Sequence, residues 1–338
     1  MLSRRDTTVD VMRGIAIILV VLGHAGINDY SWNAIYFFHM PLFFFISGCF
    51  FKPLKENSII SYMKTLKWKS LYRPFVIYSL LFLAFTPLLY YWGISGTHLV
   101  TRKEWVKSVE LILRFRTASV DLLNIFWFLP VLFAAHALFL FINIKIQRKW
   151  QLAIIAIFLF LLGRWCYNHG YNEPYDFSRI MYLSAFYIGG FCSYSYLNKY
   201  ATNIWLFLGA LFSFFYFTFT PHEVFASILC YMYVALCGIL ITFFVSTQIV
   251  KTKCMNDWLS YIGKHTMSIY VFHTIAIKCS EWVIAKNGII EFSKGWPGRA
   301  PIDGLWWFYT VIGIVVPIAF VWMKSRILNS IKHRNEST

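Results

Sequence analysis

The first apolar stretch of the sequence carries two ionisable side chains whose spacing suggests a shared passage. Arg13 and His24 are eleven residues apart, which at about 100° per residue makes three helical turns plus roughly 20°. Both side chains therefore project from one helix face, roughly 16 Å apart at 1.5 Å per residue. An imidazole can act as a general base or a nucleophile, and a guanidinium can bind an anion. The alternative is that Arg13 snorkels to lipid headgroups and His24 is an ordinary interfacial residue.

Other polar residues accompany this pair in or beside apolar stretches, where ionisable groups are costly and by default indicate function. Asp10 lies one turn before Arg13 and could hold its guanidinium, although an ordinary N-terminal charge pair has the same pattern. His39 shortly precedes Pro41, whose missing N–H frees a backbone carbonyl that protein or water must satisfy. We expect His39 to face the same cavity as His24, unless it only begins a helix at the outer surface.

A further group of candidates lies in the C-terminal half of the chain. His273 follows His265 by eight residues, which places the two side chains on one helix face, and Glu281 follows His273 by eight. We expect His273 to join the site. His136 is expected to be a buried core histidine.

Composition indicates which kind of element positions these residues. Of the 338 residues, 59% are hydrophobic, 20% are aromatic and only 14% are charged, with a mean hydropathy of +0.58. Soluble domains are about half apolar and a quarter charged. This excludes a water-soluble enzyme with one core and predicts an all-α, polytopic membrane helix bundle. We expect a single domain over 1–338 with a short polar tail at 324–338, and no cleavable signal, because residues 1–13 lead directly into the first apolar stretch.

Ten stretches are candidate transmembrane helices, each near the length of about 20 residues that a bilayer requires. They cover about 9–27, 33–51, 74–92, 122–144, 150–167, 180–197, 203–220, 224–247, 264–285 and 304–323. With a cytoplasmic N-terminus and alternating spans, nearly all of the net charge of +16 falls on the cytoplasmic side. The positive-inside rule requires this bias, so both ends are predicted to be cytoplasmic and no nucleic-acid partner is needed.

Two of the loops between the predicted spans, and the cysteines, carry further information. The loop 93–121 has an apolar helical stripe of Trp105, Val109 and Ile112 and is expected to lie on the outer membrane surface. The loop 164–179 is polar and aromatic. The seven cysteines form no Cys-x-x-Cys and none sits near a histidine at metal-ligand spacing, so neither a disulfide framework nor a metal site is predicted.

Four motifs together resemble the acyltransferase-3 family of integral membrane acyltransferases, over nearly the whole chain. Within that family, the fucose 4-O-acetylase-like and O-antigen acetyltransferase branch is the most similar. The motifs are Asp10-x-x-Arg13-Gly-Ile-Ala with Gly23-His24, His39-Met-Pro-Leu-Phe-Phe-Phe-Ile-Ser47-Gly, Trp127-Phe-Leu, and Ser268-Ile-Tyr-Val-Phe-His273.

The resemblance implies transfer of an acyl group, usually acetyl, from cytoplasmic acetyl-CoA to a hydroxyl of an extracytoplasmic glycan or lipid-linked sugar. It also implies a bacterial cell membrane and acyl-CoA as a co-substrate with no bound cofactor. Arg13 and His24 match the family's essential pair. The motif residues that remain (Asp10, His39, Ser47, Trp127 and His273) become candidates for substrate binding. Where the family often has Arg-x-x-Arg before the third span, this chain has Lys67, Lys69 and Arg73 at a different spacing, as candidate contacts for the CoA phosphates.

The geometry of the residues suits this chemistry. The basic stretch 64–73 and Arg13 offer charges for the phosphates, and the thin pantetheine arm could extend along the first span to His24. His24 would then act on a sugar hydroxyl, either as a general base or through an acyl-imidazole. Aromatic rings at Trp127, Tyr171 and Tyr175 could stack on the sugar, or could be ordinary interfacial aromatics.

Two other functional classes remain at this stage. A transporter or flippase could use His24, His39 and His273 as a proton relay, although no internal repeat relates two halves of the chain. A membrane subunit without activity would leave the alignment of Arg13 with His24 unexplained.

Overall fold

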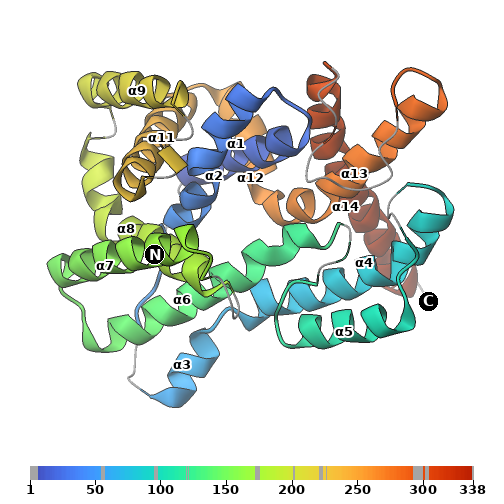
Figure 1. The fold of residues 1–338 in the computed structure, drawn as a ribbon, viewed down its shortest axis with the longest axis horizontal. Coiled ribbons are helices and arrows are strands. Elements are labelled where there is room, and N and C mark those ends of the chain that lie inside the picture. The colour runs from blue at the N-terminus through green and yellow to red at the C-terminus, as the bar shows by residue number, and fades with distance from the viewer. Residues whose placement is uncertain are drawn as a thin grey trace.

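The structure, a computed structural model, describes residues 7–54, 58–94, 98–118, 120, 122–171, 176–200, 202–220, 224–225, 227–291, 300 and 304–336. These residues are mostly helical and none of them forms a strand (Figure 1). Two short turns of other types occur: a π-helical turn, η1 (Trp68–Tyr72), and a 3-10 turn, η2 (Asn124–Trp127). The α-helices are α1 (Thr7–His24), α2 (Asp29–Cys49), α3 (Ile59–Thr65), α4 (Arg73–Tyr91), α5 (Arg102–Leu113), α6 (Phe128–Lys145), α7 (Lys149–Asn168), α8 (Phe177–Tyr200), α9 (Ile204–Thr218), α11 (Ile228–Ile249), α12 (Lys253–Lys264), α13 (Thr266–Lys286) and α14 (Trp306–Glu336).

Each of the ten predicted stretches coincides with a helix, but not all of these helices have the composition of a membrane span. Among the described residues, six are long and apolar enough to cross a bilayer: Thr7–His24, Ile60–Tyr91, Asn124–Lys145, Lys149–Asn168, Ile228–Ile249 and Trp306–Met323. Helix α9 is shorter, whereas α2, α8 and α13 are long enough but more polar. The protein is therefore an all-helical membrane protein, and ten crossings remain a prediction.

Helix α1 lies inside the bundle and contacts α2, α11, α12, α13 and α14 (Figure 1). Most of its apolar side chains are buried, as Val9, Met12, Ile17 and Val21 are each at most 1% exposed, and the others are half-buried. A helix that is hydrophobic all round is stable only in such surroundings. The bundle thereby encloses the helix that carries the Arg13–His24 pair.

Glycines allow the closest helix contacts in the bundle. A Cβ atom at Gly14 would collide with the backbone of α12 at Leu259, and one at Gly263 would collide with the backbone of α1 at Asp10. Small residues let membrane helices approach to backbone contact. Helix α12, which no predicted span covers, is therefore packed directly against the first half of α1.

The contact between α2 and α8 has the same basis and yields a stability prediction. A Cβ atom at Gly190 would collide with the backbone of Phe45, whereas one at the neighbouring Gly189 would have no atom within 4 Å. We expect Gly190→Ala to lower the free energy of unfolding by about 1–3 kcal/mol, the usual cost of overpacking. Gly189→Ala should leave it unchanged or slightly raise it through helix propensity. Thermal unfolding of the two variants in the same detergent measures the difference, and equal stabilities would contradict the proposed contact.

The loop 93–121 is only partly as expected. It contains the predicted amphipathic helix, α5, which begins with a capping box between Thr101 and Glu104. However, α5 lies along α4 (Figure 1), and the Tyr72 hydroxyl at the start of α4 donates to Leu113 O over 3.2 Å. Of the apolar stripe, Ile112 is fully buried while Trp105 is 42% exposed.

The structure adds three details to the predicted segments. The segment after α5 turns inward, since Ala118, Leu122 and Phe126 are at most 2% exposed. The stretch 324–338, predicted as a tail, continues α14 as far as Glu336. Helix α7 extends to Asn168, so the first residues of the predicted loop 164–179 are helical.

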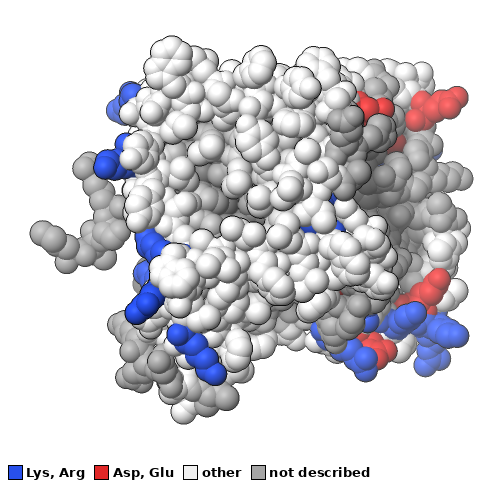
Figure 2. Space-filling view, turned by 60° about the vertical axis from the view of Figure 1, so that its left-hand side comes forward, with Lys and Arg blue, Asp and Glu red and all other residues white. Residues whose placement is uncertain are grey.

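On the face that Figure 2 shows, most charged side chains lie at two opposite edges. On this face (Figure 2), one edge carries Lys and Arg alone, the other carries both signs, and the surface between them is almost uncharged. An uncharged band between two charged edges is the arrangement that a bilayer requires.

Candidate active site

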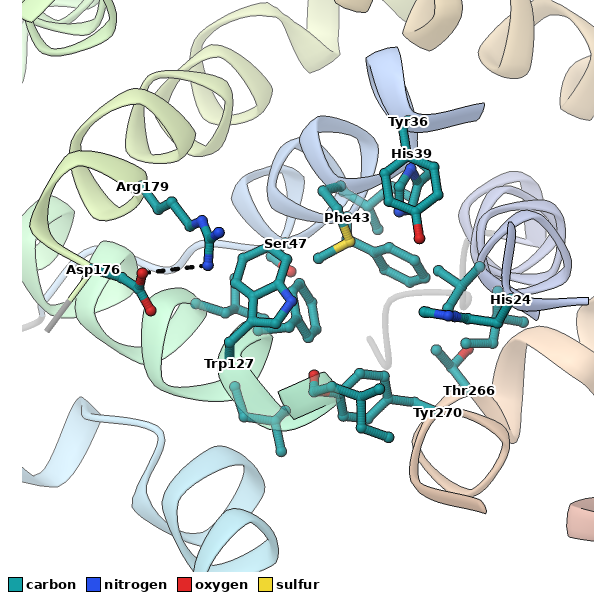
Figure 3. A pocket seen from close by; sticks show the side chains of 18 of the residues that line it. His24, Tyr36, His39, Phe43, Ser47, Trp127, Asp176, Arg179, Thr266 and Tyr270 are labelled. Atoms are coloured by element: carbon teal, nitrogen blue, oxygen red, sulfur yellow. Dashed lines mark hydrogen bonds and ion pairs between the residues drawn. The ribbon is translucent and has the colours of Figure 1, made fainter. Parts of the chain in front are cut away.

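A large cavity lies among α1, α2, α6, α7, α8, α12 and α13 and has a volume of about 1390 Å³ (Figure 3). Sites for a single small molecule commonly measure about 300–1,000 Å³. The cavity is therefore large enough for two substrates. Of the predicted site residues it is lined by Arg13, His24, His39, Ser47, Trp127 and His273.

The end of α1 determines where His24 lies. The helix ends at His24, and Gly26 follows in the left-handed region with φ of +75°, the conformation that commonly ends a helix. The backbone N–H of Ala300 donates to His24 O over 2.8 Å. Asn28 then caps α2 by accepting from the N–H of Ser31 over 2.9 Å. This tight connection keeps the last turn of α1 beside the first turns of α2.

His273 lies next to His24, with 5.2 Å between the ring centroids. Its Nδ1 lies 3.0 Å from Ile269 O and 2.8 Å from Tyr270 O, so Nδ1 carries the proton, because a carbonyl can only accept. In the neutral ring Nε2 then carries a lone pair, and this atom is buried without a hydrogen-bond partner. The structure thus brings a second imidazole against His24.

His39 also lies on the His24 side of the cavity. Its Nδ1 donates to Ile35 O over 2.8 Å, one helical turn earlier, and its ring meets Tyr36 edge-on with 4.7 Å between centroids. The Tyr36 ring packs directly on Gly23, and the charged forms of His39 and His24 would repel each other. Figure 3 shows Tyr36, His39 and His24 on one side of the cavity.

The other end of α1 brings cations to the cavity. The Arg13 guanidinium lies 3.7 Å from Asp10, as the spacing of the two residues predicts, and 4.9 Å from the Phe50 ring centroid. Lys264, at the end of α12, also lines the cavity. Asp10 itself is 2% exposed and does not reach the lining.

The charged side chains of the basic stretch before the third predicted span do not line the cavity, although Leu71 within that stretch does. Lys67, Lys69 and Arg73 are all described, and none of them is among the lining residues. Lys67 lies over the Tyr187 ring at 5.9 Å, while Lys69 and Arg73 are exposed. The π-helical turn at Trp68–Tyr72 rotates the chain between α3 and α4, which alters the direction that a regular helix would give these side chains.

The cavity wall opposite His24 contains charged residues that the sequence analysis did not single out. Asp176 and Arg179 form an ion pair of 3.3 Å, and the Arg179 guanidinium lies 4.8 Å from the Trp127 ring centroid (Figure 3). Arg164 on α7 also lines the cavity and is 3% exposed. An arginine inside the predicted span 150–167 was the available signal, but residue 164 also began the predicted loop 164–179 and was described only as part of that loop.

Three remaining candidates lie away from the cavity or outside the described residues. Tyr171 is 60% exposed and stacks on Trp165, outside the lining. Tyr175 lies outside the residues that the structure describes. His136 is buried, as expected, and its Nδ1 is hydrogen-bonded to the Tyr187 hydroxyl over 2.8 Å.

An apolar helical bundle that encloses imidazoles in a cavity with arginines at two ends defines a membrane protein with a polar reaction or transport chamber. Comparison with protein families decides between these classes. A family model described as an acyltransferase domain, that of the acyltransferase-3 family, matches residues 6–326. The chain therefore belongs to this family of membrane acyltransferases. Neither the curated proteins nor the solved structures gave a match.

Proposed function

We propose that the protein is an O-acetyltransferase that moves an acetyl group from cytoplasmic acetyl-CoA to a hydroxyl of an extracytoplasmic glycan or lipid-linked sugar. In this proposal the chain crosses a bacterial cell membrane ten times as one acyltransferase domain, with both ends in the cytoplasm. The edge with Lys and Arg alone in Figure 2 then faces the cytoplasm, in line with the positive-inside rule.

One observation carries the proposal: Arg13 and His24 line the same cavity at two levels. Helix α1 is uninterrupted between them, so roughly 16 Å separates the two levels. Arg13 and Lys264 offer two cations for the phosphates of CoA at one level. The narrow pantetheine arm would then cover the distance to His24, where the thioester meets the acceptor.

In the transfer step, the sugar oxygen bonds to the thioester carbonyl carbon while His24 accepts the hydroxyl proton. The C–S bond then breaks, CoA leaves as a thiolate, and the proton on His24 passes to that thiolate. We propose His273 as a positioning residue, because its ring lies against His24 and its Nε2 lone pair can accept from the imidazolium that forms. Asp10 would position Arg13 in the same way.

The direct test uses the purified full-length protein in detergent, with acetyl-CoA and no ion gradient. We expect release of the CoA thiol, faster in the presence of a glycan acceptor, followed by a thiol-reactive dye. Cells with and without the gene should differ in acetylation of a surface glycan, detected by mass spectrometry and NMR. A preparation that is folded but releases no CoA with or without acceptors would contradict the proposed reaction.

A further inference from the structure

The end of the cavity between α7 and α8 contains a buried arginine among tyrosine rings. The guanidinium carbon of Arg164 lies 4.2 Å from the ring centroid of Tyr231, 5.0 Å from that of Tyr167 and 5.7 Å from that of Tyr182. Arg164 and all three tyrosines line the cavity. Such rings favour a cation by their electrostatic field, but they do not accept strong hydrogen bonds in the guanidinium plane.

The hydrogen bonds of Arg164 are incomplete. Its Nη2 donates to Phe225 O over 2.6 Å, while its Nε is buried without a partner. Within the described part of the chain, no carboxylate lies within 4.0 Å of this guanidinium. Burying an arginine without a counter-ion is costly unless some other group supplies the missing acceptors. A ligand in the cavity can supply them.

Helix α2 shows where this arginine lies relative to the reaction. Phe225, the hydrogen-bond partner of Arg164, contacts Phe37 with 4.9 Å between ring centroids. Phe37 is next to Tyr36, which packs on the residue before His24, whereas Arg13 lies against Phe50 at the other end of α2. Thirteen residues of helix, or roughly 20 Å, separate Phe37 from Phe50. Arg164 is therefore at the level of His24 and far from the cations proposed for CoA.

We propose that this end of the cavity is a subsite for an anionic group on the acceptor, a carboxylate or a phosphate ester carried by the glycan, and that Arg164 determines this specificity. The inference rests on the proposed acyl transfer. The planar guanidinium fork matches either anion. Arg179 adds a second cation, but it is already paired with Asp176, so Arg164 supplies the unbalanced charge. Trp127, which lies against Arg179, offers a flat surface for the sugar ring.

Binding to the purified full-length protein without acyl-CoA tests this subsite. The probes are glucuronate, glucose 1-phosphate and neutral glucose, measured by isothermal titration calorimetry at constant ionic strength. Wild-type protein should bind at least one anionic probe about tenfold or more tightly than glucose. The probe that it prefers distinguishes a carboxylate from a phosphate. If neither anion binds more tightly than glucose, the proposal is wrong.

Matched variants assign the preference to Arg164. Arg164→Gln retains a donor for Phe225 O but removes the charge, and Arg164→Lys retains the charge but removes the fork. We expect Arg164→Gln to weaken binding of the anion about 10- to 100-fold, with glucose binding within threefold and thermal stability unchanged, and Arg164→Lys to be intermediate. Arg13→Gln should leave glucuronate binding intact. The proposal would be overturned if Arg13→Gln weakened anion binding while Arg164→Gln did not. It would also be overturned if Arg164→Gln weakened binding of the anion and of glucose equally.

Release of CoA from acetyl-CoA without any acceptor separates this inference from the proposed function. If wild type and Arg164→Gln both release CoA but neither shows a preference for an anionic probe, acyl transfer stands and the anionic subsite does not. If the wild type releases no CoA but the anion preference depends on Arg164, the subsite stands without the proposed reaction.

Discussion

Replacing His24 with alanine is expected to abolish acyl transfer while leaving membrane insertion and thermal stability intact. A positioned general base contributes about 10²- to 10⁴-fold to a rate, and loss of a nucleophile costs at least as much. The side chain is partly exposed to the cavity at the end of α1, so its removal disturbs little packing. The measurement is the rate of CoA release with an acceptor, compared between variants at equal protein concentration.

His98→Ala provides the matched control, because His98 is an exposed histidine beside Glu104, near α5 and outside the cavity. This variant should keep the wild-type rate. Incubation with radiolabelled acetyl-CoA without an acceptor separates the two roles of His24, since only a nucleophile leaves label on the protein. Full transfer activity in His24→Ala would move the chemistry to another residue.

The second large effect is expected for Arg13→Ala, which should raise the KM for acetyl-CoA about 10- to 100-fold. Charge-assisted hydrogen bonds contribute about 1.5–3 kcal/mol, and each 1.4 kcal/mol corresponds to a factor of ten. Steady-state kinetics with acetyl-CoA varied at saturating acceptor measures this change. Arg13→Lys should recover part of the loss, because it restores the charge without the planar fork.

A control for charge alone is Arg148→Ala, at the exposed start of α7 and outside the lining of the cavity. Its KM for acetyl-CoA should remain within threefold of wild type. If Arg13→Ala changes neither KM nor kcat, Arg13 has no part in binding CoA, and its role would be structural, through contacts such as those with Asp10 and Phe50.

The sequence predicts the site best where one regular helix carries it. Arg13 and His24 line one cavity because α1 is uninterrupted between them, so the arithmetic of helical periodicity applies without correction. His39 could be expected on the same side from its place near the start of α2, just before Pro41, which lies inside the helix without ending it. In both cases the position of a residue along its helix is sufficient to predict that its side chain lines the cavity.

Other parts of the site depend on features that spacing does not contain. Lys69 and Arg73 are exposed and outside the cavity lining, and they belong to an irregular connection between α3 and α4 that contains a π-helical turn, which no residue type in the sequence demands. The packing of α12 on α1 depends on Gly14 and Gly263 meeting across two segments that are distant in the sequence. Arg164 lies inside the predicted span 150–167, but its burial among tyrosines depends on α8 and α11, which residue spacing within α7 does not reveal.

The position of His24 in the last turn of α1 has an electrostatic consequence. The aligned peptide dipoles of a helix give its carboxyl end a partial negative charge, which stabilises a nearby cation by about 0.3–1 kcal/mol, and more where water is excluded. In the transfer step that we propose, His24 takes up a proton, and the new positive charge develops at that end of α1. The main chain of one helix would thus raise the rate by a factor of a few. Moving the imidazole to the first turn of a helix would reverse the sign of this contribution.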